Sequence, residues 1–124
     1  MKVLALDYGS ARTGIAVSDP TGTLARPLGV AALVATPAGF EGLLGMIRAE
    51  APERVVVGLP LTLRGARGAQ AQETLRFVKA LRGAISVPVE IYDERFTSVL
   101  AGGDDAKAAA YLLSSYLEWR RGPP

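Results

Sequence analysis

The 124-residue sequence predicts a single α/β domain, a mixed five-stranded sheet with helices on both faces. Three short strand-like runs follow one another at the start of the chain, which indicates an antiparallel meander. Two further apolar runs then alternate with segments of helical periodicity, as is typical of βαβ units with parallel strands. A chain of 124 residues suffices for one core and is too short for two domains.

The first three strands are predicted at residues 2–8, 13–18 and 24–33. The first is an apolar run that meets Asp7 and then the turn residues Gly9 and Ser10, so it should form a hairpin with the second. The third contains Pro27, which has no N–H to donate. We therefore expect this strand to lie at an edge or to be irregular there.

The middle of the chain predicts a helix, a buried strand and a second helix. Thr36 and Pro37 form a helix-start signal, and Pro52 ends the element. Phe40, Leu43, Leu44 and Ile47 give this helix its apolar stripe. Residues 54–58 are a short β-branched run that indicates a parallel strand. A loop is expected over 59–68, then a helix over 69–82 with Leu75, Val78 and Leu81 on its apolar side.

The last two predicted elements are a strand at residues 87–92 and a helix at 104–121. The helix shows an apolar stripe of Ala109, Leu112, Leu113, Tyr116 and Leu117. Residues 121–124, with a glycine and two prolines, are expected to be a frayed tail.

The composition excludes several kinds of site. There is no cysteine, which rules out disulfides and thiolate nucleophiles, and no histidine, which rules out imidazole bases and most zinc sites. Acids, bases and metal ligands must therefore come from Asp, Glu, Lys, Tyr or the backbone. No segment is typical of a signal peptide or a membrane span, so we expect no membrane contact. The lack of cysteine is compatible with a reducing cytoplasm.

The net charge of +2 hides an uneven distribution. Between residues 54 and 82 six basic side chains accompany one acid, whereas eight basic residues face eleven acids elsewhere. Such a basic segment suits a partner that carries phosphate. It is equally compatible with a solvated helix face.

Acidic residues stand at three places where predicted apolar elements begin or end: Asp7, Asp93 with Glu94, and Asp104 with Asp105. The carboxyl ends of parallel strands meet at one edge of a sheet, so these carboxylates can gather there. Their mutual repulsion would then require a cation, and an all-oxygen set selects Mg²⁺ or Mn²⁺. Each has a simpler alternative, as a helix cap, a turn residue or a surface ion pair. Asp7 is the strongest candidate, because a carboxylate at the end of a buried strand is costly unless something satisfies it.

The loop before the second helix carries Arg64 and Arg67 among its glycines. With the backbone N–H groups of the helix start, they form a candidate nucleic-acid contact. A plain connection between strand and helix is an equal alternative.

Four ordered stretches of the sequence resemble the YqgF (RuvX) family of bacterial proteins, described as Holliday junction resolvases and as pre-16S rRNA nucleases. The matching residues are Leu6, Asp7, Tyr8, Gly9, Arg12, Gly14, Ala16, Val17, Ser18, Asp19 and Pro20; Val56 to Leu61 with Gly65, Gly68, Ala71 and Gln72; Tyr92 to Ser98; and Asp105, Ala106, Ala108, Ala109, Leu112, Leu113, Tyr116, Leu117 and Glu118.

This resemblance implies an RNase H-like fold, metal-dependent hydrolysis of phosphodiesters in structured nucleic acid, and a cytoplasmic location. By position it implies Asp7, Glu94 and Asp105 as catalytic, metal-holding acids, with Asp93 and Asp104 as alternates. Arg12, Arg95 and Thr97 are the motif residues expected to face the substrate. Processing of the 5′ end of pre-16S rRNA is the first expectation, by a monomer or weak homodimer.

The sequence departs from the family pattern between Ser98 and Asp104, where a helix-sized segment is missing. Whether Asp105 reaches Asp7 then depends on a link containing Gly102 and Gly103. Three alternatives stay open: a resolvase of branched DNA, a non-catalytic nucleic-acid-binding module, and a nucleotide-phosphate binder of the actin-like kind.

Overall fold

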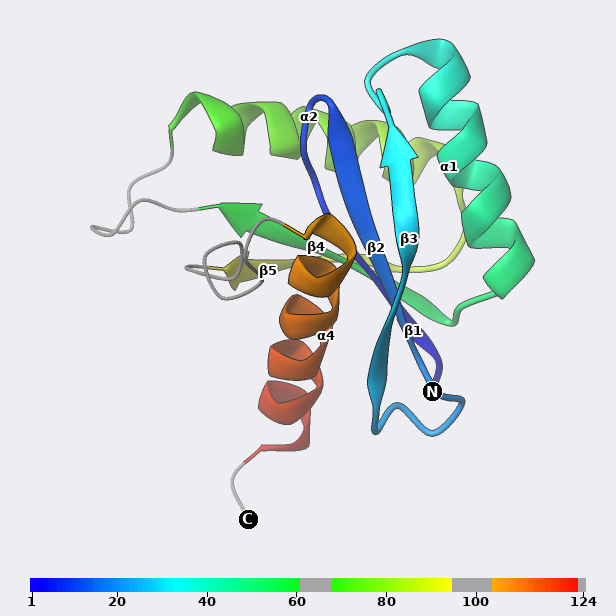
Figure 1. Cartoon of the computed structure of the whole chain (residues 1–124), viewed down its shortest axis with the longest axis vertical. Helices are drawn as coiled ribbons and strands as arrows, with labels where there is room; N and C mark the ends of the chain where they lie inside the picture. Colours follow the sequence, from blue (N-terminus) through cyan, green and yellow to red (C-terminus); the bar gives the residue numbers. More distant parts are fainter. Residues whose placement is uncertain (61–67, 95–103, 123–124) are drawn as a thin grey trace.

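The computed structural model describes residues 1–60, 68–94 and 104–122, with the backbone alone at residues 60 and 94. Its elements follow the predicted order (Figure 1). They are β1 (Val3–Asp7), β2 (Arg12–Ser18), β3 (Ala25–Ala32), α1 (Pro37–Glu50), β4 (Arg54–Pro60), α2 (Ala69–Ala84), β5 (Val89–Glu94) and α4 (Asp105–Arg121).

The five strands form one mixed sheet, as predicted, and their order in the sheet is β3-β2-β1-β4-β5. The pairs β1–β2 and β2–β3 are antiparallel, whereas β1–β4 and β4–β5 are parallel. β3 lies at an edge, and its pairing with β2 shifts register between Ile15 and Ala16, opposite the stretch that contains Pro27. The expected effect of this proline is therefore confirmed.

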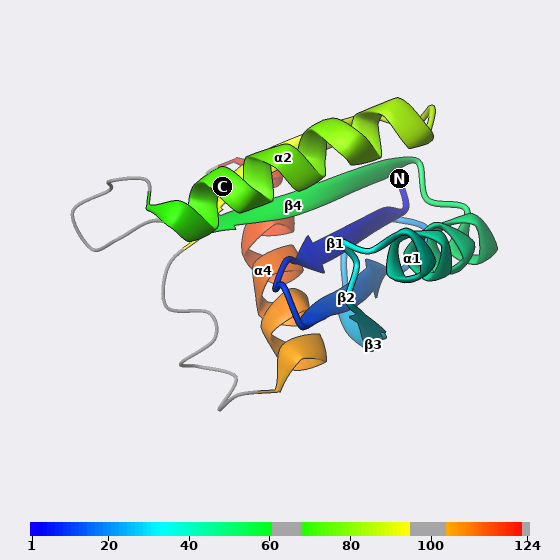
Figure 2. The same ribbon diagram turned by 90° about the horizontal axis from the view of Figure 1, so that it is seen from above.

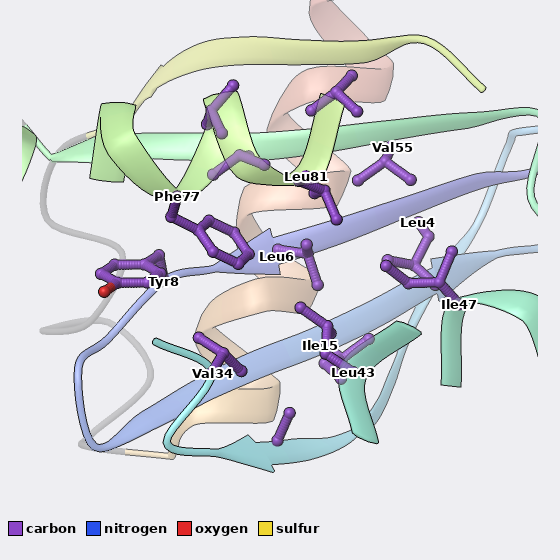
Figure 3. Packing of buried hydrophobic residues seen from close by; sticks show 14 of the residues in the cluster. Leu4, Leu6, Tyr8, Ile15, Val34, Leu43, Ile47, Val55, Phe77 and Leu81 are labelled. Atoms are coloured by element: carbon purple, nitrogen blue, oxygen red, sulfur yellow. The ribbon is translucent and has the colours of Figure 1, made fainter. Parts of the chain in front are cut away.

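Helices cover both faces of the sheet, as predicted (Figure 2). On the face of α1 and α2, a large cluster includes Leu4, Leu6, Val55 and Val57 (Figure 3). On the opposite face, α4 packs its own apolar stripe against Val3 and its neighbours. Alternate residues of β1 and β4 thus belong to different cores, as the pleat requires.

The apolar stripes of the helices agree with prediction in α4 and nearly so in α1. Thr36 caps α1 by accepting a hydrogen bond from the Gly39 N–H at 3.1 Å, and Pro37 begins the helix. In α2 the buried side is wider than predicted. It includes Phe77 and Thr74, whereas Leu75 is half-buried.

Two strands end later in the chain than predicted. β4 continues to Pro60 and β5 to Glu94, because the parallel pairing carries on through Leu59 with Asp93 and Pro60 with Glu94. Asp93 and Glu94 thus lie inside the strand rather than after it.

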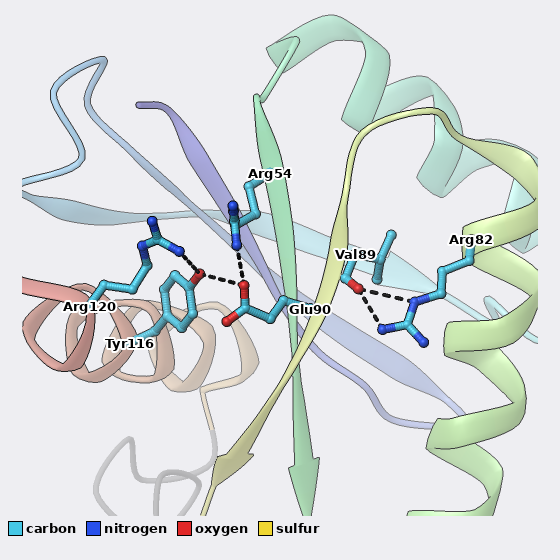
Figure 4. Close-up of polar contacts among 6 residues, drawn as sticks. All are labelled: Arg54, Arg82, Val89, Glu90, Tyr116 and Arg120. Carbon is cyan, nitrogen blue, oxygen red and sulfur yellow. Dashed lines mark hydrogen bonds and ion pairs between the residues drawn. The ribbon is translucent and has the colours of Figure 1, made fainter.

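A polar network fixes the far half of α4 on the sheet (Figure 4). Glu90 of β5 accepts hydrogen bonds from Arg54 and from the Tyr116 hydroxyl, the latter at 3.0 Å. On the other face, Arg82 of α2 donates two hydrogen bonds to the carbonyl of Val89, at 3.1 and 2.7 Å.

Among the helices of the described ranges, none has the length and apolarity needed to cross a bilayer.

Candidate metal centre at the carboxyl edge of the sheet

Asp7 is the last residue of β1 and continues the row formed by Val3 and Ala5. That row packs against α4, so the pleat directs Asp7 toward the α4 face. The next residue, Tyr8, lies in the core of the opposite face. The turn that follows is held by Thr13, whose hydroxyl donates to the Gly9 carbonyl at 3.2 Å.

Gly14 brings the start of α4 to Asp7. It is the register partner of Asp7 on β2, and a Cβ placed there would lie 1.9 Å from the backbone oxygen of Asp105. Only a residue without a side chain permits this approach. The first residue of α4 therefore lies directly over the strand next to Asp7, and the sequence departure before it does not prevent the encounter.

The surroundings of Asp7 disfavour its charge. Burial, and to a smaller extent the negative charge of Asp105, raise the pKa of Asp7 from 3.8 to about 6. Desolvation of a carboxylate and a like charge nearby both stabilise the protonated form. A cation bound between the two carboxylates would offset their repulsion and stabilise their ionised forms.

The two acids at the start of α4 have different roles. Asp104 is the N-cap, and its carboxylate accepts a hydrogen bond from the Lys107 N–H at 2.9 Å. Asp105 is the first helical residue and influences Asp7 electrostatically. The simple alternative of a helix cap thus applies to Asp104, which makes it a weak alternate ligand.

Arg12, at the beginning of β2, pairs with Asp105. Its Nε lies 3.0 Å from Oδ2 of Asp105, and 68% of its side chain is exposed. The guanidinium therefore neutralises part of the acidic pair and keeps donors available to solvent. Its predicted contact with substrate stays a prediction.

Asp93 and Glu94 differ in the face to which their positions belong. Val89 and Ile91 pack on the core of α1 and α2, so the alternation of β5 assigns exposed Asp93 to that side, away from Asp7. Within the described residues, no group of three or more acidic, histidine or cysteine side chains is arranged to hold a metal. The structure thus brings together Asp7 and Asp105.

Four of the predicted nucleic-acid contacts, Arg64, Arg67, Arg95 and Thr97, lie outside the described residues. Gly14, by contrast, belongs to the sequence motif, but no role was predicted for it. Its signal was a glycine inside a strand of otherwise β-forming residues, which often marks close approach of another backbone.

The sequence of the chain matches a family of known proteins. Residues 1–119 match the family model described as "RuvX: Holliday junction resolvase". A Chloroflexus aurantiacus protein named "Putative pre-16S rRNA nuclease" is 39% identical over 137 residues, covering 98% of this chain and 90% of the relative. A protein of the same name from Chloroflexus aggregans is 38% identical over 136 residues, covering 98% and 96%.

Solved structures agree in fold. Thermus thermophilus RuvC is 20% identical, with a TM-score of 0.54 over 98% of this chain and 97% of the other. The fowlpox virus Holliday junction resolvase is 12% identical, with a TM-score of 0.56 over 96% and 99%. At these identities the likeness concerns the fold alone, a mixed five-stranded sheet with helices on both faces, as predicted.

Proposed function

This chain belongs to the RuvX family, and from that premise we propose that it is a divalent-metal-dependent endonuclease that cuts structured nucleic acid at the Asp7 edge of its sheet. One observation carries the proposal. Asp105 is brought over Gly14 to the desolvated carboxylate of Asp7. A solvated surface would separate two such acids, so their juxtaposition is characteristic of a functional site.

The residues present fit a hard divalent cation. Asp7 and Asp105 offer carboxylate oxygens, and the chain contains no histidine or cysteine to favour zinc. Oxygen ligands select Mg²⁺ or Mn²⁺. When bound, the metal would supply Lewis-acid activation of a water and charge neutralisation at the scissile phosphate.

Glu94 is the third ligand that we propose. The backbone of β5 pairs residue 94 with Pro60, and alternation along the strand assigns this position to the α4 face, opposite to that of Asp93. Asp93 is accordingly the weaker candidate of the two.

The protein's own groups would divide the remaining work. Asp7 and Asp105 would orient the metal, and a bound cation would hold Asp7 ionised at neutral pH. Arg12, with its exposed guanidinium, would contact a phosphate of the substrate strand. We expect Arg64, Arg67, Arg95 and Thr97 to add further contacts to the backbone of the nucleic acid.

The names of the relatives favour RNA as the substrate, and we propose processing of the 5′ end of pre-16S rRNA in the cytoplasm. The description of the family model names a Holliday junction resolvase, so branched DNA is the second candidate. A monomer or weak homodimer would suffice for either, and light scattering on the eluting protein would measure it.

A cleavage assay with matched variants tests the proposal. Purified protein is incubated with the 5′ flank of pre-16S rRNA and with a four-way DNA junction, in Mg²⁺, in Mn²⁺ and in chelator. We expect metal-dependent cleavage of the RNA, lost by at least about 100-fold in Asp7→Asn and Asp105→Asn. Asp104→Asn is the control, since asparagine caps a helix as well as aspartate does.

The same assay separates the alternatives. Preference for the junction would transfer the proposal to branched DNA. Undiminished cleavage by Asp7→Asn would refute the site. Salt-sensitive RNA binding without cleavage in any divalent metal would identify the non-catalytic module. Glu94→Gln, compared with Asp93→Asn, tests the third ligand.

A further inference from the structure

A hollow of about 360 Å³ lies on the face of the sheet opposite to Asp7, between the start of α1 and the middle of α2. This volume is at the small end of the range of ligand sites in proteins, about 300–1,000 Å³. The metal chemistry proposed above makes no use of it. Its lining includes Tyr8, Phe40 and Phe77 together with Glu73 and Arg76.

Three aromatic rings belong to the apolar lining of the hollow. The Tyr8 and Phe77 ring centroids are 4.8 Å apart, and Phe40 meets Phe77 edge-on at 6.4 Å. Tyr8 and Phe77 lie side by side at the end of the core cluster (Figure 3). Tyr8 and Phe77 are buried in the core, so only a small part of each ring borders the hollow, and Phe40 is the partly buried ring of the three. These rings are held in place by the core, and a planar ligand can pack against their accessible parts without ordering new side chains.

Two charged side chains on α2 form its polar part. Glu73 is half-buried, and its Oε1 accepts a hydrogen bond of 2.7 Å from the Tyr8 hydroxyl, which fixes the carboxylate. A carboxylate has about four acceptor positions, so this bond leaves it able to accept from a ligand. Arg76 is exposed at the hollow. Among the residues that the structure describes, neither forms an ion pair.

We propose that this hollow is a nucleobase site selective for guanine, with Glu73 as the reading group and Arg76 as the phosphate contact. Bases stack on aromatic side chains irrespective of sequence, and their hydrogen-bonding edges supply selectivity. Guanine presents two adjacent N–H donors on its Watson–Crick edge, which match a fixed carboxylate. Adenine presents an acceptor beside its amino group, so one carboxylate oxygen would meet a lone pair.

The hollow lies near the end of β1 that carries Asp7. Tyr8 follows Asp7 directly, and both lie where β1 ends, on opposite faces of the sheet. A guanine bound here could be an unpaired base of the substrate strand or the base of a free nucleotide. Only the first of these rests on the proposed nuclease function.

Calorimetric titration with the four 5′-ribonucleoside monophosphates tests the site. Wild type should bind GMP most tightly. Glu73→Gln should weaken GMP by about tenfold or more and bring the GMP-to-AMP ratio close to one, since a charge-assisted acceptor is lost. Arg76→Ala should weaken all four nucleotides alike.

Two further variants make the result specific. Lys79→Ala removes a positive charge from the exposed side of α2, outside the hollow, and should leave GMP affinity unchanged. Asp7→Asn should abolish cleavage without changing GMP affinity, so failure of the nuclease proposal and failure of the base site are distinguishable. Equal affinity for the four nucleotides, no binding at millimolar concentration, or full GMP selectivity in Glu73→Gln would overturn the guanine site.

Competition between GMP and the RNA substrate identifies the source of the base. If GMP displaces the RNA, and replacing an unpaired guanine of the RNA by adenine weakens its binding, the base belongs to the substrate. If GMP binds selectively without displacing the RNA, the ligand is a free nucleotide. Both results support the guanine site.

Discussion

Replacing Asp7 with asparagine should make the folded protein more stable at neutral pH while abolishing its cleavage of nucleic acid. In the fold, burial first and the charge of Asp105 second raise the pKa of Asp7 from 3.8 to about 6. The ionised side chain is therefore less favourable in the folded than in the unfolded chain. One pKa unit corresponds to about 1.36 kcal/mol, so the destabilisation amounts to about 3 kcal/mol.

The direction of the pKa shift of Asp7 determines the pH range in which the variant and wild type differ in stability. Below the unfolded pKa of 3.8, Asp7 is protonated in both states and costs nothing. As the pH rises toward 6, the folded state retains its proton while the unfolded state loses it, so stability falls. Asparagine stays neutral throughout, and its amide can donate to Asp105. The difference between variant and wild type should thus grow between pH 3.8 and about 6 and then level off.

Urea unfolding in chelator across this pH range measures the effect, with Asp104→Asn as a control of the same chemical change at a solvated cap. At neutral pH we expect Asp7→Asn to be more stable by up to about 3 kcal/mol, or roughly 10 °C in melting temperature. Adding Mg²⁺ or Mn²⁺ should stabilise wild type alone, by about 2.7 kcal/mol at a hundredfold excess over Kd. A variant that is less stable than wild type at neutral pH, or unfolding curves that stay parallel across the range, would refute the reasoning.

Three further predictions concern the surroundings of the site. Gly14→Ala should displace α4 from the sheet and lower both metal affinity and cleavage by at least about tenfold. Gly29→Ala is the control and should change neither, because the Cβ of its alanine would meet only a Met46 methyl at 3.6 Å. Equal metal titrations for the two variants would contradict the close approach of α4 to Gly14. Glu90→Ala should cost about 2 kcal/mol in urea unfolding, because Arg54 and Tyr116 lose a charged acceptor, and leave metal affinity unchanged; a full loss of metal binding would count against a purely structural role. Arg12→Ala should weaken RNA binding about equally for all sequences and reduce the slope of log affinity against log salt by about one, and an unchanged slope would remove Arg12 from the phosphate contacts.

The sequence was informative wherever a periodic pattern met a clear stop. The hairpin after Asp7 was predicted because Gly9 and Ser10 interrupt an apolar run, and α1 because Thr36 and Pro37 are a specific start signal. The end of β5 was predicted two residues early because acidic residues resemble a strand boundary. Parallel pairing with β4 instead continues through them, and pairing between distant segments is not visible in local composition.

For the candidate site, the sequence indicates candidate residues but not how they are arranged. Asp7 and Asp105 were both singled out, but nothing in their spacing says that the helix of one lies over the strand beside the other. The close approach of this helix depends on Gly14, because any side chain at that position would collide with the backbone of Asp105. Likewise, the difference between Asp93 and Glu94 follows from the pleat only after the bounds of β5 are established.

The anchoring of α4 has a consequence for how such proteins can diverge. The helix is fixed at its start by its own cap and by the contact with Gly14, and farther along by Tyr116 on Glu90. These contacts all join residues that the structure describes, and each acts on α4 itself. We therefore expect them to hold Asp105 in place in related chains whose connection between β5 and α4 has another length. The carboxylate pair and the helix that carries Asp105 would then form the constant part of such proteins, and the connection before the helix the part that varies.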